Sequence, residues 1–104
     1  MIYVTTAAIA GREITASLGT VRGSTVRARN VGRDLFADLK NIVGGEISEY
    51  TKLLAQSREQ AIKRMLDDAG NLGADAIVNV RFTTSQVMQG AAEMLAYGTA
   101  VKLK

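Results

Sequence analysis

The sequence predicts an α+β fold in which a small antiparallel sheet carries two helices on one face, in the order β-β-α-α-β-β. Two observations predict it. Segments 76–82 and 94–103 alternate apolar and polar residues with the period of two that is typical of half-buried strands. Segment 48–72 repeats apolar residues with the helical period of 3.6. A chain of 104 residues has the length of one domain, so residues 1–104 are predicted to fold as a single domain.

Residues 13–29 are predicted to form the first long strand. Their apolar residues keep one parity up to Gly19 and change to the other beyond it (Ile14, Ala16 and Leu18, then Val21). Such a change of phase indicates a β-bulge or bend, because glycine tolerates the backbone angles that a bulge requires. A phosphate-cradling loop is the alternative for the run Gly19-Thr-Val-Arg-Gly23, but no helix begins immediately after it to supply amide groups.

Two helices are predicted between the strands. The first begins at Asn30, a good N-cap, and ends at Gly44-Gly45, with apolar residues at helical spacing (Val31, Leu35, Leu39 and Ile42). The second begins at Ser48, spans residues 48–72 and ends before Gly73, a predicted C′ residue. At 1.5 Å per residue this second helix would be about 37 Å long. Its apolar stripe is predicted to face the sheet (Tyr50, Leu53, Leu54, Ser57, Ala61, Met65, Ala69 and Leu72).

The two C-terminal strands are predicted to pair with each other. The region around Gly90 between them has the composition of a turn or loop, so the pair is predicted to be an antiparallel hairpin. With the N-terminal strands, the hairpin gives a small antiparallel sheet whose apolar face the helices cover.

Composition excludes several classes of function. The chain has no His and no Cys, which excludes a Ser-His-Asp triad, a thiol nucleophile, a disulfide framework and a Cys/His zinc site. The net charge of +3 is too small to predict a nucleic-acid or membrane-surface partner. The first charged residue is Arg12, and the apolar stretch before it is far shorter than the roughly 20 residues of a membrane span. A cytoplasmic protein is predicted.

The sequence also predicts that the chain assembles with itself. Its aromatic residues are two Phe and three Tyr, with no Trp, so the core of one chain is small. Several apolar residues lie off the predicted core parity (Ile62, Leu66, Ile77 and Met88). A short open sheet also needs cover at its edges, and homo-oligomerisation would cover both features.

Six polar residues are candidates for a ligand site (Arg33, Asp34, Tyr50, Arg58, Glu59 and Asp75). The functional interpretation is a site near the Gly44-Gly45 turn that binds a small anion or metabolite. Arginine suits such a site because its rigid fork of donors matches a carboxylate or phosphate. The alternative is that these residues form ion pairs that register the helices or join two subunits. Tyr50 and Glu59 are an acid and a base in principle, but no third group completes a catalytic constellation. No catalytic residue is predicted.

Six short motifs together carry a family resemblance. They are Gly19-Thr-Val-Arg-Gly23, Arg33-Asp34, Ile42-Val-Gly-Gly45 followed by Tyr50, Arg58-Glu59-Gln-Ala61, Gly73-Ala-Asp-Ala-Ile-Val78 with Arg81-Phe82, and Gly98-Thr-Ala-Val101. Over nearly its whole length the chain resembles the YbjQ-like family of small bacterial and archaeal proteins. The resemblance implies an α+β subunit of the dodecin-like type, assembled into a ring that is typically a homopentamer. It brings a heavy-metal-binding label and no established biochemical activity.

The residue types do not match the heavy-metal label. Soft metals prefer thiolate, thioether or imidazole ligands, and the chain offers four Met as its soft donors. Met65 lies in the helical stripe, where it is interpreted as packing, whereas Met88 and Met94 flank a turn across which they could approach each other. Asp67-Asp68 is interpreted as a helix-surface pair, and no calcium-loop spacing occurs. No metal ligand and no cofactor is predicted.

The predicted function is that of a non-catalytic, ring-forming homo-oligomer that binds a metal ion or a small anionic ligand at its subunit interfaces. One alternative is a purely structural or interaction module without a ligand. Another is an enzyme that uses Tyr50, Arg58 and Glu59. A nucleic-acid surface over the basic residues between Arg22 and Arg33 is not predicted, because interleaved stacking aromatics are missing there.

Overall fold

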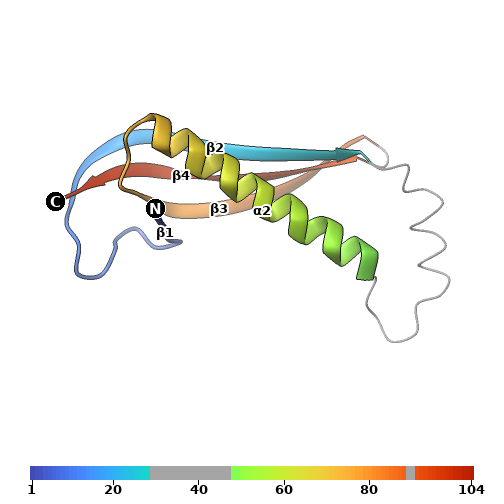
Figure 1. Cartoon of the computed structure of the whole chain (residues 1–104), viewed down its shortest axis with the longest axis horizontal. Coiled ribbons are helices and arrows are strands. Elements are labelled where there is room, and N and C mark those ends of the chain that lie inside the picture. The colour runs from blue at the N-terminus through green and yellow to red at the C-terminus, as the bar shows by residue number, and fades with distance from the viewer. Residues whose placement is uncertain (29–47, 89–90) are drawn as a thin grey trace.

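A computed structural model of the chain describes residues 1–28, 48–88 and 91–104. Four strands and one helix are present in these residues: β1 (Ile2–Tyr3), β2 (Ile14–Ala28), α2 (Ser48–Asn71), β3 (Ala76–Met88) and β4 (Ala91–Leu103). The strands form one sheet in the order β1-β3-β4-β2, and α2 crosses one face of it (Figure 1). The α+β class is confirmed. The predicted helix that begins at Asn30 lies outside the described residues.

The sequence predicts a wholly antiparallel sheet, but the observed sheet is mixed. β4 pairs antiparallel with both β2 and β3, which confirms the hairpin, but β1 pairs parallel with β3 through Ile2↔Ala76 and Tyr3↔Ile77. The sequence could not reveal β1, because a strand of two residues has no alternation that distinguishes it from a loop.

The long helix and its end agree with the sequence prediction. α2 ends at Asn71, and the Gly73 backbone has a φ of 73°, as a C′ glycine requires. The Ala74 N–H donates to the Ala69 carbonyl at 3.1 Å, and the Gly73 N–H donates to the Gly70 carbonyl at 3.0 Å. These two bonds form a Schellman motif, which satisfies carbonyls that the helix itself leaves without partners.

Two of the register shifts in the sheet lie at residues with a positive φ. The predicted one is confirmed, since the register of β2 shifts between Ser17 and Gly19, and Gly19 has a φ of 119°. A second, unpredicted bulge lies in β3, whose register shifts between Val78 and Arg81 around Asn79, a non-glycine residue with a φ of 54°. Because an extra residue inverts the alternation, β3 presents apolar side chains to both faces of the sheet.

The core therefore has two parts. Under α2, the helix residues Ala61, Met65 and Ala69 pack on a set of buried strand residues (Val21, Ile77, Val80, Ala96 and Ala100). On the opposite face, the N-terminal segment covers a smaller cluster (Ala76, Val78 and Val101, with Val4 and Ile9 packed against it).

Three of the four residues predicted to lie outside the core are packed within the chain. Ile77 is fully buried, Ile62 is 8% exposed, and Leu66 is partly buried against the larger cluster. Ile77 is buried because α2 and the N-terminal segment cover opposite faces of β3 at this end, so both parities of the strand are buried. Met88 is exposed, as predicted.

The strands extend beyond the part of the sheet that these two clusters cover. β3 continues to Met88, six residues past its predicted end, and every residue from Arg81 to Met88 is exposed. The radius of gyration is 17.0 Å and the principal extents are 54 × 26 × 16 Å. A compact domain of this length has a radius of gyration of about 13 Å, so the chain is markedly elongated.

Candidate functional site

The predicted ligand residues are not all neighbours in the described part of the chain. Arg58 and Glu59 are exposed on α2, and Tyr50 lies in the first turn of this helix. Asp75 follows the other end of α2, and the ~20 Å of helix between Arg58 and Asn71 separates it from Arg58 and Glu59. Arg33 and Asp34 lie outside the described residues. Their role in binding stays a prediction.

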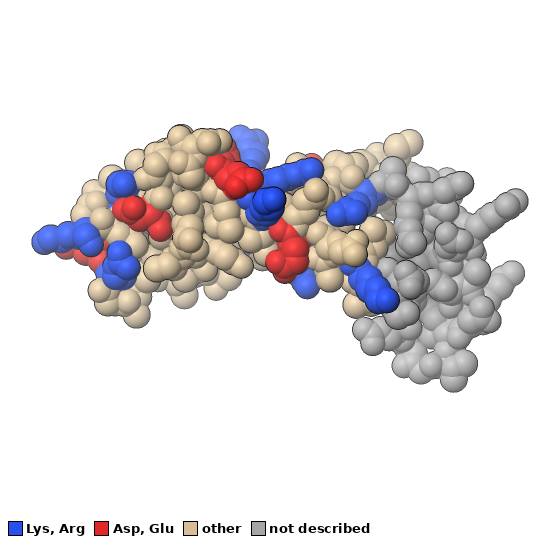
Figure 2. Space-filling model, in the orientation of Figure 1, with Lys and Arg blue, Asp and Glu red and all other residues tan. Residues whose placement is uncertain are grey.

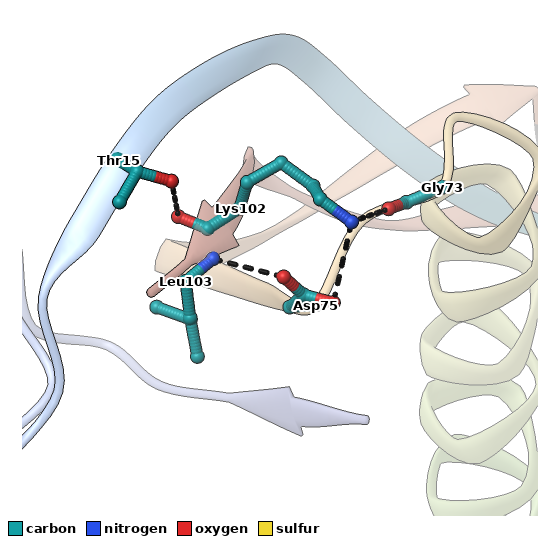
Figure 3. A network of polar contacts seen from close by, with 5 residues as sticks. All are labelled: Thr15, Gly73, Asp75, Lys102 and Leu103. Carbon is teal, nitrogen blue, oxygen red and sulfur yellow. Dashed lines mark hydrogen bonds and ion pairs between the residues drawn. The ribbon is translucent and has the colours of Figure 1, made fainter.

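Asp75 takes part in a polar network that ties the end of α2 to the end of β4 (Figure 3). Its Oδ2 accepts from the Leu103 N–H at 2.9 Å, and its Oδ1 lies 3.5 Å from the Lys102 Nζ. The same ammonium group donates to the Gly73 carbonyl at 3.0 Å, and the Lys102 carbonyl accepts from the Thr15 hydroxyl at 3.3 Å. Both carboxylate oxygens are therefore already engaged within the chain.

The charge of Asp75 is stabilised by this arrangement. The hydrogen bond from the Leu103 N–H, followed by the nearby Lys102 ammonium, lowers the pKa of the Asp75 carboxyl below its ordinary value. A carboxylate held in this way is a clamp between two elements. It is a poor general base, since a lowered pKa weakens its attraction for a proton at neutral pH.

A groove of about 600 Å³ lies between the C-terminal half of α2 and the outer edge of β2. Its lining residues are mostly charged or polar (Thr20, Arg22, Arg64, Asp67, Asp68, Asn71 and Leu72). Figure 2 shows basic and acidic side chains gathered over the middle of the face that carries α2. The sequence does not indicate these residues as a ligand site, because the groove forms only when the helix lies beside the edge of a strand far away in the sequence.

Two groove residues bind the backbone of β2 directly. Asp68 Oδ2 accepts from the Arg22 N–H at 3.1 Å, and Arg64 Nη1 donates to the Ser24 carbonyl at 2.6 Å. Arg64 and Asp68 lie one turn apart on α2, so the pair reaches backbone groups of two successive outward-pointing residues of the edge strand. We call this pair the edge clamp. The side chain of Arg22 is not part of the clamp, which uses only its backbone.

Fold and site together define a small two-layer α+β protein whose described polar residues clamp strands and line a groove. The chain belongs to the YbjQ family, since the family model described as "Putative heavy-metal-binding" matches residues 1–104.

Curated relatives from archaea and bacteria match this chain over nearly the whole length of both proteins. A "UPF0145 protein" of Archaeoglobus fulgidus is 60% identical over 104 residues, which are 100% of this chain and 96% of the relative. Another from Methanosarcina acetivorans is 59% identical, covering 99% of this chain and 97% of the relative. A third from Photobacterium profundum is 59% identical, covering 99% of this chain and 100% of the relative.

A solved structure shares the fold. It is the crystal structure of a protein of unknown function in the DUF74 family from Pediococcus pentosaceus, with a TM-score of 0.67 and 18% sequence identity. The match covers 100% of this chain and 98% of that chain.

The donor set of this chain does not fit the soft metal that the family description names. The chain has no Cys or His, and the Met65 side chain is fully buried between α2 and the sheet. Met94 pairs with Thr84, whose hydroxyl donates to its sulfur at 3.4 Å, whereas Met88 pairs with Ala91. Because residues 91 and 94 of one strand point to opposite faces, Met88 and Met94 lie on opposite sides of the sheet. The two thioethers that could have approached each other across the hairpin are therefore not brought together on one face of the sheet.

Carboxylates provide no alternative centre in the residues that the structure describes. Among them, no group of three or more Asp and Glu side chains is close enough to hold a metal ion. Within the same residues, no helix is long and apolar enough to cross a membrane.

Proposed function

We propose that the protein is a non-catalytic, cytoplasmic ring protein that assembles from copies of itself, with five subunits, and binds a small anionic ligand beside its subunit boundaries. The observation that supports assembly is the exposed end of β3. Phe82 is 42% exposed, Val87 53% and Met88 66%, on a strand that projects beyond the two core clusters. Three large apolar side chains exposed on one projecting strand end favour a surface that a partner covers.

The strand on the other side of β4 also has an exposed apolar residue at this end of the sheet. Val26 of β2 is 56% exposed and lies level with Ser85 of β3, because both residues pair with Glu93 of β4. The elongated shape supports the same proposal, since a chain with a radius of gyration of 17.0 Å leaves more surface uncovered than a compact domain does.

The groove beside α2 supports the choice of an anionic ligand. Arg64 and Arg22 bring two guanidinium groups to its walls, and guanidinium groups recognise carboxylates and phosphates. Arginine does not coordinate metal ions, and the two aspartates that share the groove belong to no group of three or more acidic residues that could hold a metal ion in the described part of the chain. The groove therefore favours an anion over a metal. Binding is measured as a rise in unfolding temperature, with inorganic pyrophosphate as the probe.

The mass of the protein in solution tests the assembly. At low micromolar concentration, sedimentation equilibrium is expected to give about 56 kDa, five times the 11.1 kDa chain. An obligate interface is expected to bury on the order of 2,000 Å² or more, so this mass should not fall on moderate dilution. A species of 11 kDa would show that one chain is self-sufficient, and another multiple would retain assembly but contradict five subunits.

A further inference from the structure

We infer that copies of this chain join head to tail through their sheets: the outer edge of β3 in one copy, residues 82–88, pairs as a parallel strand with the outer edge of β2 in the next, residues 25–28. This inference rests on the proposed self-assembly and names the surface that performs it. The partner is a second copy of the chain.

The outer edge of β3 has a covered half and an open half. The N-terminal segment covers the first half: the Val4 N–H donates to the Ile77 carbonyl at 2.9 Å, and the Val80 N–H donates to the Val4 carbonyl at 3.0 Å. From Phe82 to Met88, no strand lies on this side within the described ranges 1–28, 48–88 and 91–104. The backbone groups of a long edge strand bind another strand readily.

The open half of β3 also lacks the usual protection of an edge. Natural sheets discourage strand addition with Lys, Pro or other charged residues on the edge strand. Residues 82–88 read Phe-Thr-Thr-Ser-Gln-Val-Met, with no charge and no proline. β-branched and aromatic residues favour strand structure, so the segment is suited to pair with another strand.

The outer edge of β2, in contrast, is protected in its middle and open at its end. The edge clamp occupies the Arg22 N–H and the Ser24 carbonyl, and these are positions that an added strand would need. Outward-pointing backbone groups recur every second residue, so those of Val26 and Ala28 point to the same side, beyond the clamp. In the described part of the chain no strand lies beside them, since β2 is at the end of the sheet.

The two open edges are level with each other. Glu93 of β4 pairs with Val26 on one side and Ser85 on the other, and Ala91 pairs with Ala28 and Met88. β2 and β3 are both antiparallel to β4, so they run parallel to each other, and a rotated copy presents its β2 parallel to β3 of its neighbour. One repeated contact of this kind covers both edges, and a repeated head-to-tail contact closes into a ring when the rotation allows.

The competing arrangement is a two-fold contact between β3 and β3 of another copy. That contact would leave the end of β2 uncovered in every copy, so it covers only half of the open backbone. Head-to-tail pairing is therefore the arrangement that the edges favour.

Disulfide cross-linking tests the contact, because the chain has no cysteine of its own. The double variants V26C/S85C and V26C/T83C place thiols on the same sheet face at the two open edges. Under a mild oxidant they are expected to give a ladder of covalent multimers on a denaturing gel, while V26C and S85C alone remain at the mass of one chain. The matched control is T15C/V26C, whose two thiols are both on β2 and which is expected to give no ladder.

The outcomes separate this inference from the proposed assembly. Dimers from S85C or T83C alone would overturn the head-to-tail arrangement in favour of the two-fold contact. An oligomer by sedimentation with no ladder from either double variant would overturn the β3–β2 contact and leave self-assembly intact. A protein that sediments as one chain would overturn both.

Discussion

At the scale of single residues, Gly23 determines how closely the helix approaches the sheet. A Cβ placed on Gly23 would collide with the backbone of α2, at the Ala61 carbonyl and the Met65 N–H group. These are atoms of a regular helix, which cannot turn aside as a flexible side chain can. The glycine is required for close packing here and not for an unusual backbone angle, since Gly23 does not have a positive φ.

Gly23→Ala is therefore expected to destabilise the protein by about 1–3 kcal/mol, because α2 must move away from β2. The matched control is Gly70→Ala, which also adds one methyl group but meets no atom within 4 Å. Because alanine favours helices, Gly70→Ala is expected to stabilise by up to about 1 kcal/mol. Urea unfolding curves measure both. Equal stabilities for Gly23→Ala and wild type would contradict the close contact.

The bulge at Asn79 could not be predicted from the sequence. The bulge at Gly19 was predictable, because the apolar residues of β2 change parity there and a glycine lies at the change. In β3 the residues Ala76, Val78, Val80 and Phe82 keep a regular alternation through the bulge, so the sequence predicts one buried parity. The backbone of Asn79 is instead held in the left-handed region, and its N–H donates to the Thr6 carbonyl at 2.9 Å. Asparagine tolerates this region better than most residues but does not require it.

At the scale of elements, local sequence patterns were sufficient to predict a helix or strand wherever one of its faces is buried and the other is exposed. The helix at residues 48–72 and the strand at 13–29 satisfy that condition, and their predicted bounds agree with the structure within one residue. The hairpin was predicted as a pair, but β3 is six residues longer than its predicted range. The extension of β3 from Thr83 to Met88 was not predicted, because a strand exposed on both faces need not alternate apolar and polar residues. The edge clamp was also missed, since Arg64 and Asp68 bind backbone groups, for which a sequence carries no signal.

The network around Asp75 joins elements, so its effect on stability should depend on pH. The pKa of Asp75 is lowered in the folded protein, so the unfolded chain binds the proton more tightly. The stabilisation is therefore complete above the unfolded pKa of about 4 and is lost as the pH falls through the lower folded pKa.

Asp75→Asn is expected to lower stability at pH 7 and to remove this part of the acid dependence. The measurement is the free energy of unfolding in urea between pH 7 and pH 3. Asp67→Asn, which changes an exposed aspartate of α2 outside the network, serves as the control and should leave the difference between the two pH values unchanged. An acid dependence that is the same in Asp75→Asn and wild type would show that the clamp does not act through its charge.

At the scale of the whole molecule, the proposed contact places the ligand groove close to a subunit boundary. The groove is bounded by Thr20 and Arg22 of β2, and the open edge of the same strand begins three residues further along. A ligand in the groove would therefore lie beside the neighbouring copy. It would stabilise the folded state without being needed for assembly, because the β3 edge does not contribute to the groove.

Inorganic pyrophosphate is expected to raise the unfolding temperature of the wild-type protein, because a ligand that binds only the folded state stabilises it by about 2.7 kcal/mol at a hundred times Kd. Arg22→Ala should abolish this rise while keeping the fold, since the edge clamp uses the backbone N–H of Arg22 and not its side chain. Arg58→Ala removes an exposed guanidinium of α2 outside the groove and should retain the rise, with sodium chloride at matched ionic strength as the salt control.

Loss of the rise in Arg58→Ala but not in Arg22→Ala would move the ligand to the residues around Arg58 that the sequence predicts. No rise with pyrophosphate, phosphate or citrate in the wild type would leave a structural ring without an anionic ligand.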